Sequence, residues 1–229
     1  MDLPPITPPS RAPILDDTDF LLADNRASPA WLEPRSARAI TGGKFSEEGR
    51  LARILDVGCG PNKYPGATGV DMNPNTAADV LCHLDQGGLP FRDNSFDQVR
   101  AEHFIEHVAD VIATMEEFHR VTRPGGTIFI LTPHYTDCNS FTDPTHRRHL
   151  NTYSFHYFYP GGRHGRSEMW YTKARMREAR LRVRLLRLWR ALGFEFLVNH
   201  SRMFRQFWEQ YLSFVIRGKL MEFTFEVIK

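Results

Sequence analysis

Glycines and carboxylates in this sequence stand at the ends of short apolar runs, where a ligand could reach them. Residues 53–57 form such a run and end in Gly58-Cys59-Gly60, with Asp56 immediately before the first glycine. Glycine lets the backbone approach a ligand closely and adopt conformations that other residues avoid. The next run, residues 68–71, ends in Asp71, whose carboxylate could accept hydrogen bonds from both hydroxyls of a ribose. The pattern favours a nucleoside site.

The third apolar run, residues 79–82, is followed by Leu84 and Asp85. A carboxylate beside apolar side chains suits an adenine, whose exocyclic amine donates while its faces pack. Only eight residues separate Gly60 from Gly69, and two of them are prolines. A crossover helix does not fit there, so the helix N-terminus that holds a dinucleotide's pyrophosphate is not expected. An uncharged or sulfonium nucleoside is therefore favoured over NAD or FAD.

Histidines are the candidate general bases. They follow the fourth and fifth apolar runs, and five concern us: His103, His107, His134, His146 and His149. Imidazole changes its charge near neutral pH and can take a proton from an acceptor. We take His103 and His146 as the candidate catalytic residues, although Glu106-His107 could instead orient the loop or cap the next helix, and Asp143 to His146 could form a loop-closing hydrogen-bond network. Zinc bound by His134, His146 and His149 is an alternative, but their spacing fits no helical pair, and we expect no metal.

The elements that carry these residues indicate an α/β fold. Five short apolar runs read as strands, and residues 108–121 show the apolar spacing of an amphipathic helix. Residues 178–188 alternate apolar side chains with arginines and favour a strand over a helix, and residues 219–228 alternate as well. This order predicts a mostly parallel sheet with an antiparallel member near the end. In such sheets ligands bind beyond the carboxyl ends of the strands.

Four strings in order resemble one known family: ILDVGCGPNKYPGATGVDMNP, HLDQGGLPFRDNSFDQV, EHFIEHV and HRVTRPGGTIFILTPH. Residues 53 to 134 resemble the class I S-adenosylmethionine-dependent methyltransferases, and they look closest to compact bacterial members. The resemblance implies a Rossmann-like, seven-stranded sheet in the order 3-2-1-4-5-7-6, with strand 7 antiparallel. In this sequence the helices after the first three strands are shortened or missing. Asn62 also stands where many members keep a third glycine.

The resemblance implies S-adenosyl-L-methionine as the cofactor and assigns roles to the residues at the strand ends. The loop from Asp56 through Gly60 lies near the methionine part of the cofactor, and Asp71 takes the ribose diol. Met72 packs on the adenine, while Leu84 and Asp85 read its edge. The full set of expected cofactor-binding residues is Asp56, Gly58, Cys59, Gly60, Asp71, Met72, Leu84, Asp85, Ala101 and Glu102.

Composition places the chain among single-domain globular proteins. Hydrophobic residues make up 41% of its 229 residues, and no apolar run is long enough to span a membrane. We expect a flexible, proline-rich arm at 1–13 and one methyltransferase domain at 14–229. Within that domain we expect an N-terminal cover at 14–50, a cofactor-binding core at 53–134, and an acceptor loop, late helices and two strands at 135–229. The start lacks the pattern of a secretory signal, which favours the cytoplasm.

The charge distribution bears on the acceptor. Residues 163–190 carry ten Lys/Arg and two Asp/Glu, whereas the first 162 residues are acidic. These arginines could hold an anionic acceptor or a nucleic acid, or simply form a solvated strand face. The leading hypothesis is a methyltransferase acting on a small-molecule acceptor, with O-methylation preferred. The alternatives are a non-catalytic protein that binds the cofactor or its product, an RNA methyltransferase, which the acidic body disfavours, and a nicotinamide oxidoreductase. The oligomeric state is left open.

Overall fold

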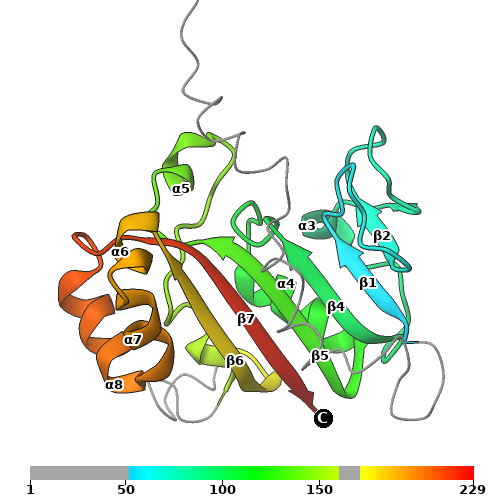
Figure 1. The fold of residues 1–229 in the computed structure, drawn as a ribbon. Coiled ribbons are helices and arrows are strands. Elements are labelled where there is room, and N and C mark those ends of the chain that lie inside the picture. The colour runs from blue at the N-terminus through cyan, green and yellow to red at the C-terminus, as the bar shows by residue number, and fades with distance from the viewer. Residues whose placement is uncertain (1–51, 160–170) are drawn as a thin grey trace, which may run out of the picture. The chain divides into compact units, whose positions relative to one another are not determined.

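The computed structural model describes residues 52–159 and 171–229, and its strands form one mixed sheet (Figure 1). The sheet has seven strands in the order β3-β2-β1-β4-β5-β7-β6, and β7 runs antiparallel to both of its neighbours. The predicted order and the antiparallel seventh strand are therefore confirmed. The strands are β1 (Ile54–Val57), β2 (Thr68–Asp71), β3 (Val80–Leu81), β4 (Phe96–Glu102), β5 (Thr122–Pro133), β6 (Arg175–Leu185) and β7 (Gly218–Ile228).

Among the described residues, one helix is long and the others are short. Residues 58–67 and 72–79 contain no helix, and the helix after β3 is a single turn. The prediction that the helices after the first three strands are shortened or missing is therefore confirmed. The helical elements are α3 (Leu84–Gly87), α4 (Val111–Val121), α5 (Asn139–Thr142), the 3₁₀ turn η1 (His156–Phe158), α6 (Arg187–Ala191), α7 (Phe194–His200), α8 (Arg202–Phe207) and the π-helical turn η3 (Trp208–Leu212). No described helix is long and apolar enough to cross a bilayer.

One face of the sheet is the core and the other is polar. Strand pairing aligns Leu55, Val99, Ile128 and Phe225 in one fully buried row. Helix α4 packs on this face through its buried apolar stripe, which includes Phe118. Because side chains alternate along a strand, the neighbouring row lies on the opposite face. That row consists of Asp56, Arg100, Phe129, Thr224 and Arg180.

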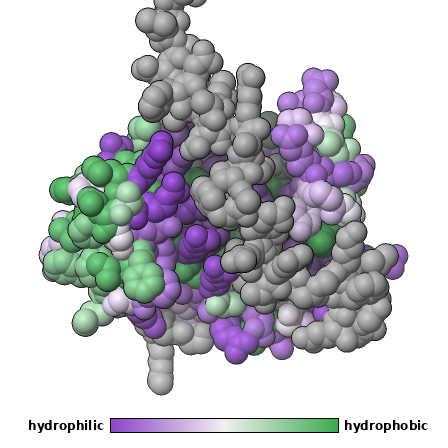
Figure 2. Space-filling view, in the orientation of Figure 1, coloured by the Kyte–Doolittle hydropathy of each residue, from purple (hydrophilic) through white to green (hydrophobic). Residues whose placement is uncertain are grey.

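Several arginines of β6 form ion pairs rather than being merely solvated. Arg184 contacts Glu222 of β7 at 2.6 Å, and Arg177 forms an ion pair with Glu226 of the same strand. Hydrophilic side chains consequently run along this part of the polar face (Figure 2). The basic segment is thus partly neutralised by β7, which weakens the case for an anionic or nucleic-acid ligand on it.

Several boundaries differ from the sequence predictions. Helix α4 begins at Val111 because the Asp110 side chain accepts hydrogen bonds from the backbone N–H groups of Ile112 and Ala113. Strand β6 ends earlier than predicted, and residues 187–191 form α6 instead. Residues 202–212 form α8 and then η3, and α8 lies beside β6 and not over β1–β3 (Figure 1).

The proline-rich arm at 1–13 and the cover at 14–50 fall outside the described residues, as does part of the arginine-rich segment. The described residues belong to one compact unit, Arg50–Lys229.

Candidate active site

The loop after β1 is shaped by two glycines in the left-handed region, Gly58 at φ +68° and Gly60 at φ +54°. The backbone N–H groups of Gly58 and Cys59 both donate to the carbonyl of Val70, at 2.8 and 3.2 Å, so the loop closes onto β2. A Cβ on Gly58 would lie 2.5 Å from Cδ2 of Phe104, whereas a Cβ on Gly60 would meet open space. The loop therefore has one side packed and one side free.

Two of the predicted carboxylates hold this loop. Asp71 accepts a hydrogen bond from Gly60 N at 3.0 Å and another from Asn73 N at 2.9 Å, one on each oxygen. Each oxygen retains a lone pair that a hydroxyl could use. Asp56 is buried and accepts from Tyr64 N at 2.7 Å. Burial raises the pKa of Asp56 above its usual range, so this carboxyl is a structural group within the loop.

The residues predicted for the adenine lie at the same edge of the sheet, after β2 and β3. Met72 is 69% exposed, which leaves its side chain accessible to a ligand. Asp85 is exposed and accepts from Ala109 N at 3.2 Å, while Leu84 is half-buried against the core. The open surface between the second and third strand ends suits a planar ring.

The other predicted cofactor residues are buried or form contacts with neighbouring side chains. Cys59 is a buried free thiol whose pKa is raised by burial, and Ala101 is fully buried in β4. Glu102 forms an ion pair with Arg100, which sequence reasoning missed. The Arg100 guanidinium lies 4.2 Å from the ring centroid of Tyr64 and 4.4 Å from that of Phe129. Arg100 thus braces the chain that follows the glycine loop.

A cavity of about 220 Å³ lies beyond the ends of β4 and β5, beside the start of β7. Its lining residues are His103, Pro133, Asp137, Asn139, Thr142, Asp143, His146, Lys219 and Leu220. The structure thus brings together both predicted catalytic histidines, which are 43 positions apart in the sequence. The next residue after His103, Phe104, contacts the glycine loop at Gly58. The residue that follows a cavity-lining histidine therefore packs against the glycine loop.

His103 is held by a buried glutamate. Its Nδ1 donates to Oε1 of Glu106 at 3.2 Å, and the other oxygen of Glu106 accepts from Thr132 Oγ1 at 3.1 Å. The hydrogen bond to Glu106 raises the pKa of His103 above its usual value. His103 also adopts a left-handed backbone conformation, φ +51°, which is uncommon for a residue with a side chain and concentrates at functional sites. Nε2 is the nitrogen left for a ligand.

His146 is fixed differently. Its Nδ1 donates to the carbonyl of Ser140 at 3.1 Å, and its Nε2 lies 3.9 Å from Oδ2 of Asp143. The ring meets that of His107 edge-on, with 4.7 Å between the centroids. Donor atoms of Glu106, His107 and His146 all lie within 4.8 Å of one another, a spacing that could accommodate a metal ion. Both oxygens of Glu106 already accept hydrogen bonds, however, which favours the histidine–glutamate pair over a metal.

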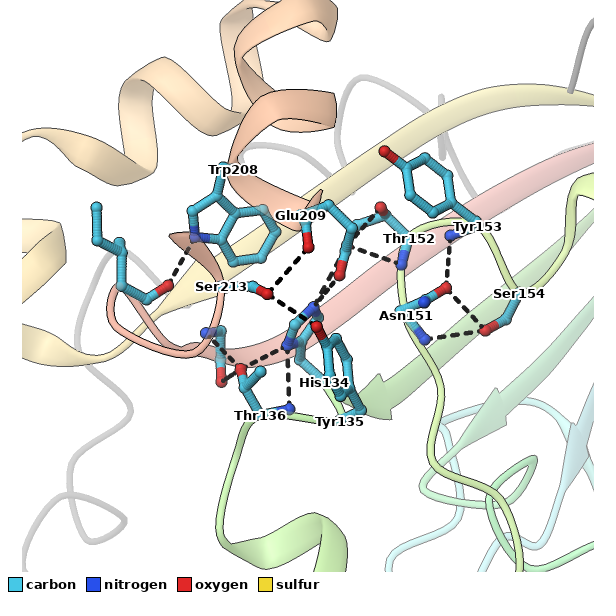
Figure 3. Close-up of polar contacts among 12 residues, drawn as sticks. His134, Tyr135, Thr136, Asn151, Thr152, Tyr153, Ser154, Trp208, Glu209 and Ser213 are labelled. Carbon is cyan, nitrogen blue, oxygen red and sulfur yellow. Dashed lines mark hydrogen bonds and ion pairs between the residues drawn. The ribbon is translucent and has the colours of Figure 1, made fainter. Parts of the chain in front are cut away.

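His134, another histidine noted in the sequence, is part of a buried structural network (Figure 3). It is fully buried, its Nδ1 accepts from Thr136 N at 3.3 Å, and its Nε2 donates to Oε1 of Glu209 at 3.2 Å. Oε2 of Glu209 accepts from Thr152 N at 3.1 Å and from Thr152 Oγ1 at 2.5 Å. Burial opposes ionisation of Glu209, but hydrogen bonds from His134 and Thr152 outweigh it and hold the Glu209 pKa below its usual range. This network ties the chain after β5 to η3.

His149 likewise lies outside the cavity, because its Nδ1 contacts Ser140 Oγ at 3.0 Å and its ring stacks on Phe141. The structure therefore separates the three histidines of the zinc alternative. His134 is engaged with Glu209, His149 with Ser140, and His146 alone lines the cavity.

Comparisons with known proteins bear on the family and the fold. A family model described as "Methyltransferase domain" matches residues 55–130. A demethylmenaquinone methyltransferase from Chlorobaculum parvum is 35% identical over 107 residues, which cover 39% of this chain and 44% of the relative. One from Staphylococcus saprophyticus is 41% identical over 115 residues, covering 38% of this chain and 49% of the relative. The match thus spans less than half the length of these relatives.

Among solved structures, the chain is similar to a SAM-dependent methyltransferase from Archaeoglobus fulgidus, with a TM-score of 0.56 and 16% identity. The similarity covers 92% of this chain and all of the other. At this identity the likeness establishes the fold, and it extends beyond the family match to the last two strands.

Proposed function

We propose that the protein methylates a small-molecule acceptor held in the cavity beside His103, because a methyltransferase family model matches residues 55–130 and the sheet has the strand order of the class I S-adenosylmethionine-dependent methyltransferases. The observation that supports this proposal most is the His103–Glu106 pair. It places an oriented, solvent-accessible base in the cavity, one residue before Phe104, which packs against the glycine loop. A protein that only binds the cofactor would have no use for a strained, carboxylate-oriented histidine at that place.

The residues present fit S-adenosylmethionine, which when bound supplies an activated methyl group on a sulfonium. The open side of Gly60 leaves room for the methionine part, and the free lone pairs of Asp71 suit the ribose hydroxyls. We assign the adenine to the surface of Met72, Leu84 and Asp85. Methyl transfer depends mainly on in-line positioning of donor and acceptor, which a cavity closed on several sides provides.

His103 acts as the general base in this proposal. Its Nε2 takes the proton from an acceptor hydroxyl, and the resulting oxyanion is the nucleophile, so O-methylation is favoured. Glu106 positions the imidazole and stabilises the imidazolium that forms. His146 lines the same cavity but is bound through Nδ1 to a backbone carbonyl, and we assign it to orientation of the acceptor rather than to proton removal.

The cavity favours a compact, uncharged acceptor. Its lining contains Asp137 and Asp143 against one lysine, Lys219, so an anion would find no excess of positive charge. Its volume of about 220 Å³ lies below the range typical of drug-sized ligands, which is roughly 300–1,000 Å³. The curated relatives are named demethylmenaquinone methyltransferases. Because the proposed base acts on a hydroxyl, a hydroxylated aromatic ring is the acceptor class we propose.

The test is transfer of labelled methyl from S-adenosylmethionine to 1,4-naphthohydroquinone under reducing conditions. We expect O-methylated product from the wild-type protein, and a rate for His103→Ala that is lower by roughly 10²–10⁴-fold. Affinity for S-adenosylhomocysteine should stay unchanged in that variant. His200→Ala, which removes an exposed histidine of α7, is the matched control and should keep the wild-type rate. Equal rates for wild type and His103→Ala would contradict the assignment of the base.

A further inference from the structure

Apolar side chains gather on the outer surface of the late helices, over α6, α7 and α8 (Figure 2). Six of them are each between 49% and 80% exposed: Leu192, Phe196, Met203, Phe207, Tyr211 and Phe214. We call this group the apolar helix surface. Exposed apolar patches of this kind in proteins mark sites of contact with another molecule or with a membrane.

The same segment is firmly attached through its other side. Val198 and Trp208 are fully buried, and the Trp208 indole N–H donates to the carbonyl of Ile216 at 2.6 Å. Glu209, next to Trp208, is bound by His134 and Thr152. The inner apolar residues therefore pack the helices against the core, and the exposed outer ones are not needed to hold the helices in place.

All exposed charged side chains in residues 186–217 are positive. Arg187, Arg190 and Arg202 are exposed, whereas no carboxylate is exposed in residues 186–217, all of which the structure describes. Of the two glutamates there, Glu195 is half-buried and accepts from Leu185 N at 3.1 Å, and Glu209 is buried. An apolar surface whose own segment carries only positive exposed charges is complementary to an anionic lipid surface.

We propose that the apolar helix surface docks the protein on the surface of membranes that contain anionic lipid. The outer apolar side chains enter the headgroup region, and the arginines face lipid phosphates. A protein partner would have to match both features, and a second copy of this chain would bring the same positive charges against one another. Charge complementarity therefore favours the membrane.

The test is flotation of the full chain with vesicles of phosphatidylglycerol and phosphatidylcholine, compared with vesicles of phosphatidylcholine alone. We expect binding to the anionic vesicles that weakens as salt is added, because salt screens the arginines. The variant Met203→Asp/Phe214→Asp should bind at least tenfold more weakly. Ile228→Asp, which alters an exposed apolar residue at the end of β7, is the matched control and should bind as the wild type does.

A second variant separates charge from apolar contact. Arg187→Gln/Arg202→Gln should weaken binding to the anionic vesicles by roughly 30-fold and leave weak binding to neutral vesicles unchanged. Thermal melting checks that each variant is folded. Absence of vesicle binding by the wild type, or equal binding by both double variants and the control, would overturn the proposal. Self-association by light scattering that the two aspartates abolish, without vesicle binding by the wild type, would assign the surface to a dimer instead.

Discussion

The imidazole of His103 and the carboxylate of Glu106 are joined by a hydrogen bond of 3.2 Å at the exit of β4. Only two residues, Phe104 and Ile105, lie between them in the chain, and His103 adopts a left-handed backbone conformation at this turn. The pair links the end of β4 to β5, because Thr132 donates to the other oxygen of Glu106. Its role can be read from the pH dependence of the rate.

Glu106→Gln should shift the pH–rate profile. The hydrogen bond to Glu106 raises the pKa of His103, and the base must be neutral to work, so the wild-type rate rises as pH increases through that raised pKa. A neutral amide supports the imidazolium less, so the pKa of His103 falls and the profile moves to lower pH. The maximal rate should also fall, by about tenfold or more, because the imidazolium loses its partner.

Single-turnover methyl transfer over about pH 5 to about pH 9 measures this shift. Glu116→Gln, which changes a carboxylate of α4 that binds Thr172, is the matched control. An unmoved profile in Glu106→Gln would mean that His103 does not titrate in the rate-limiting step.

The glycine loop allows stability to be separated from cofactor binding. Gly58→Ala should unfold more easily by about 1–3 kcal/mol, because its Cβ would meet Phe104 and its φ is left-handed. Gly60→Ala suffers only the backbone strain, about 1–2 kcal/mol, but its methyl group projects into the open space that we assign to the cofactor. Urea denaturation and titration with S-adenosylhomocysteine measure the two effects.

Gly125→Ala is the control for these two variants, since Gly125 is also left-handed, at φ +70°, with open space at its Cβ. It should lose the same stability as Gly60→Ala and keep full affinity. Equal affinities of Gly60→Ala and Gly125→Ala for S-adenosylhomocysteine would contradict the assignment of the cofactor to the glycine loop.

The His134–Glu209 pair should control stability below neutral pH. Glu209→Ala leaves a buried histidine and Thr152 without their partner and should cost about 3–5 kcal/mol. The Glu209 pKa is lowered from 4.5, so the stability that its charge contributes is present above that pH and is lost as pH falls through the lower folded value. Glu209→Gln, which keeps an acceptor for Thr152, should lack this acid-dependent loss. Urea denaturation at several pH values would detect it, and identical pH dependence in both proteins would refute the assignment.

The sequence predicted those parts of the fold that local pattern determines. Strand β2 was predicted with its observed bounds, and the glycine loop and Asp71 came together as expected, because each strand end is signalled by glycine or an acid. Helix α7 was not predicted, and the arginine-rich strand β6 was placed three residues late. The alternation that marks β6 continues into a helix with similar apolar spacing, so local pattern alone could not place its end.

The site was less accessible to sequence reasoning where partners are far apart along the chain. The contact of Glu106 with His103 occurs where His103 has a left-handed backbone conformation, which no residue type in the sequence signals. Glu209 lies 75 positions from His134, and nothing in the sequence links the two. Arg100 and Tyr64 meet only because β4 pairs with β1 and brings Arg100 under the loop.

Calorimetric titration with S-adenosylhomocysteine, NAD and ATP tests the central claim most directly, because it identifies the cofactor before the acceptor is known. We expect S-adenosylhomocysteine to bind at one site and the other two to bind far more weakly or not at all. Asp71→Ala should weaken that binding by roughly 1.5–3 kcal/mol, about tenfold to a hundredfold, through the loss of the ribose contact. Asp79→Ala removes a carboxylate that holds the same region through Gly69 and Lys63, and it should have little effect on affinity. Tighter binding of NAD than of S-adenosylhomocysteine, or unchanged affinity in Asp71→Ala, would contradict the account.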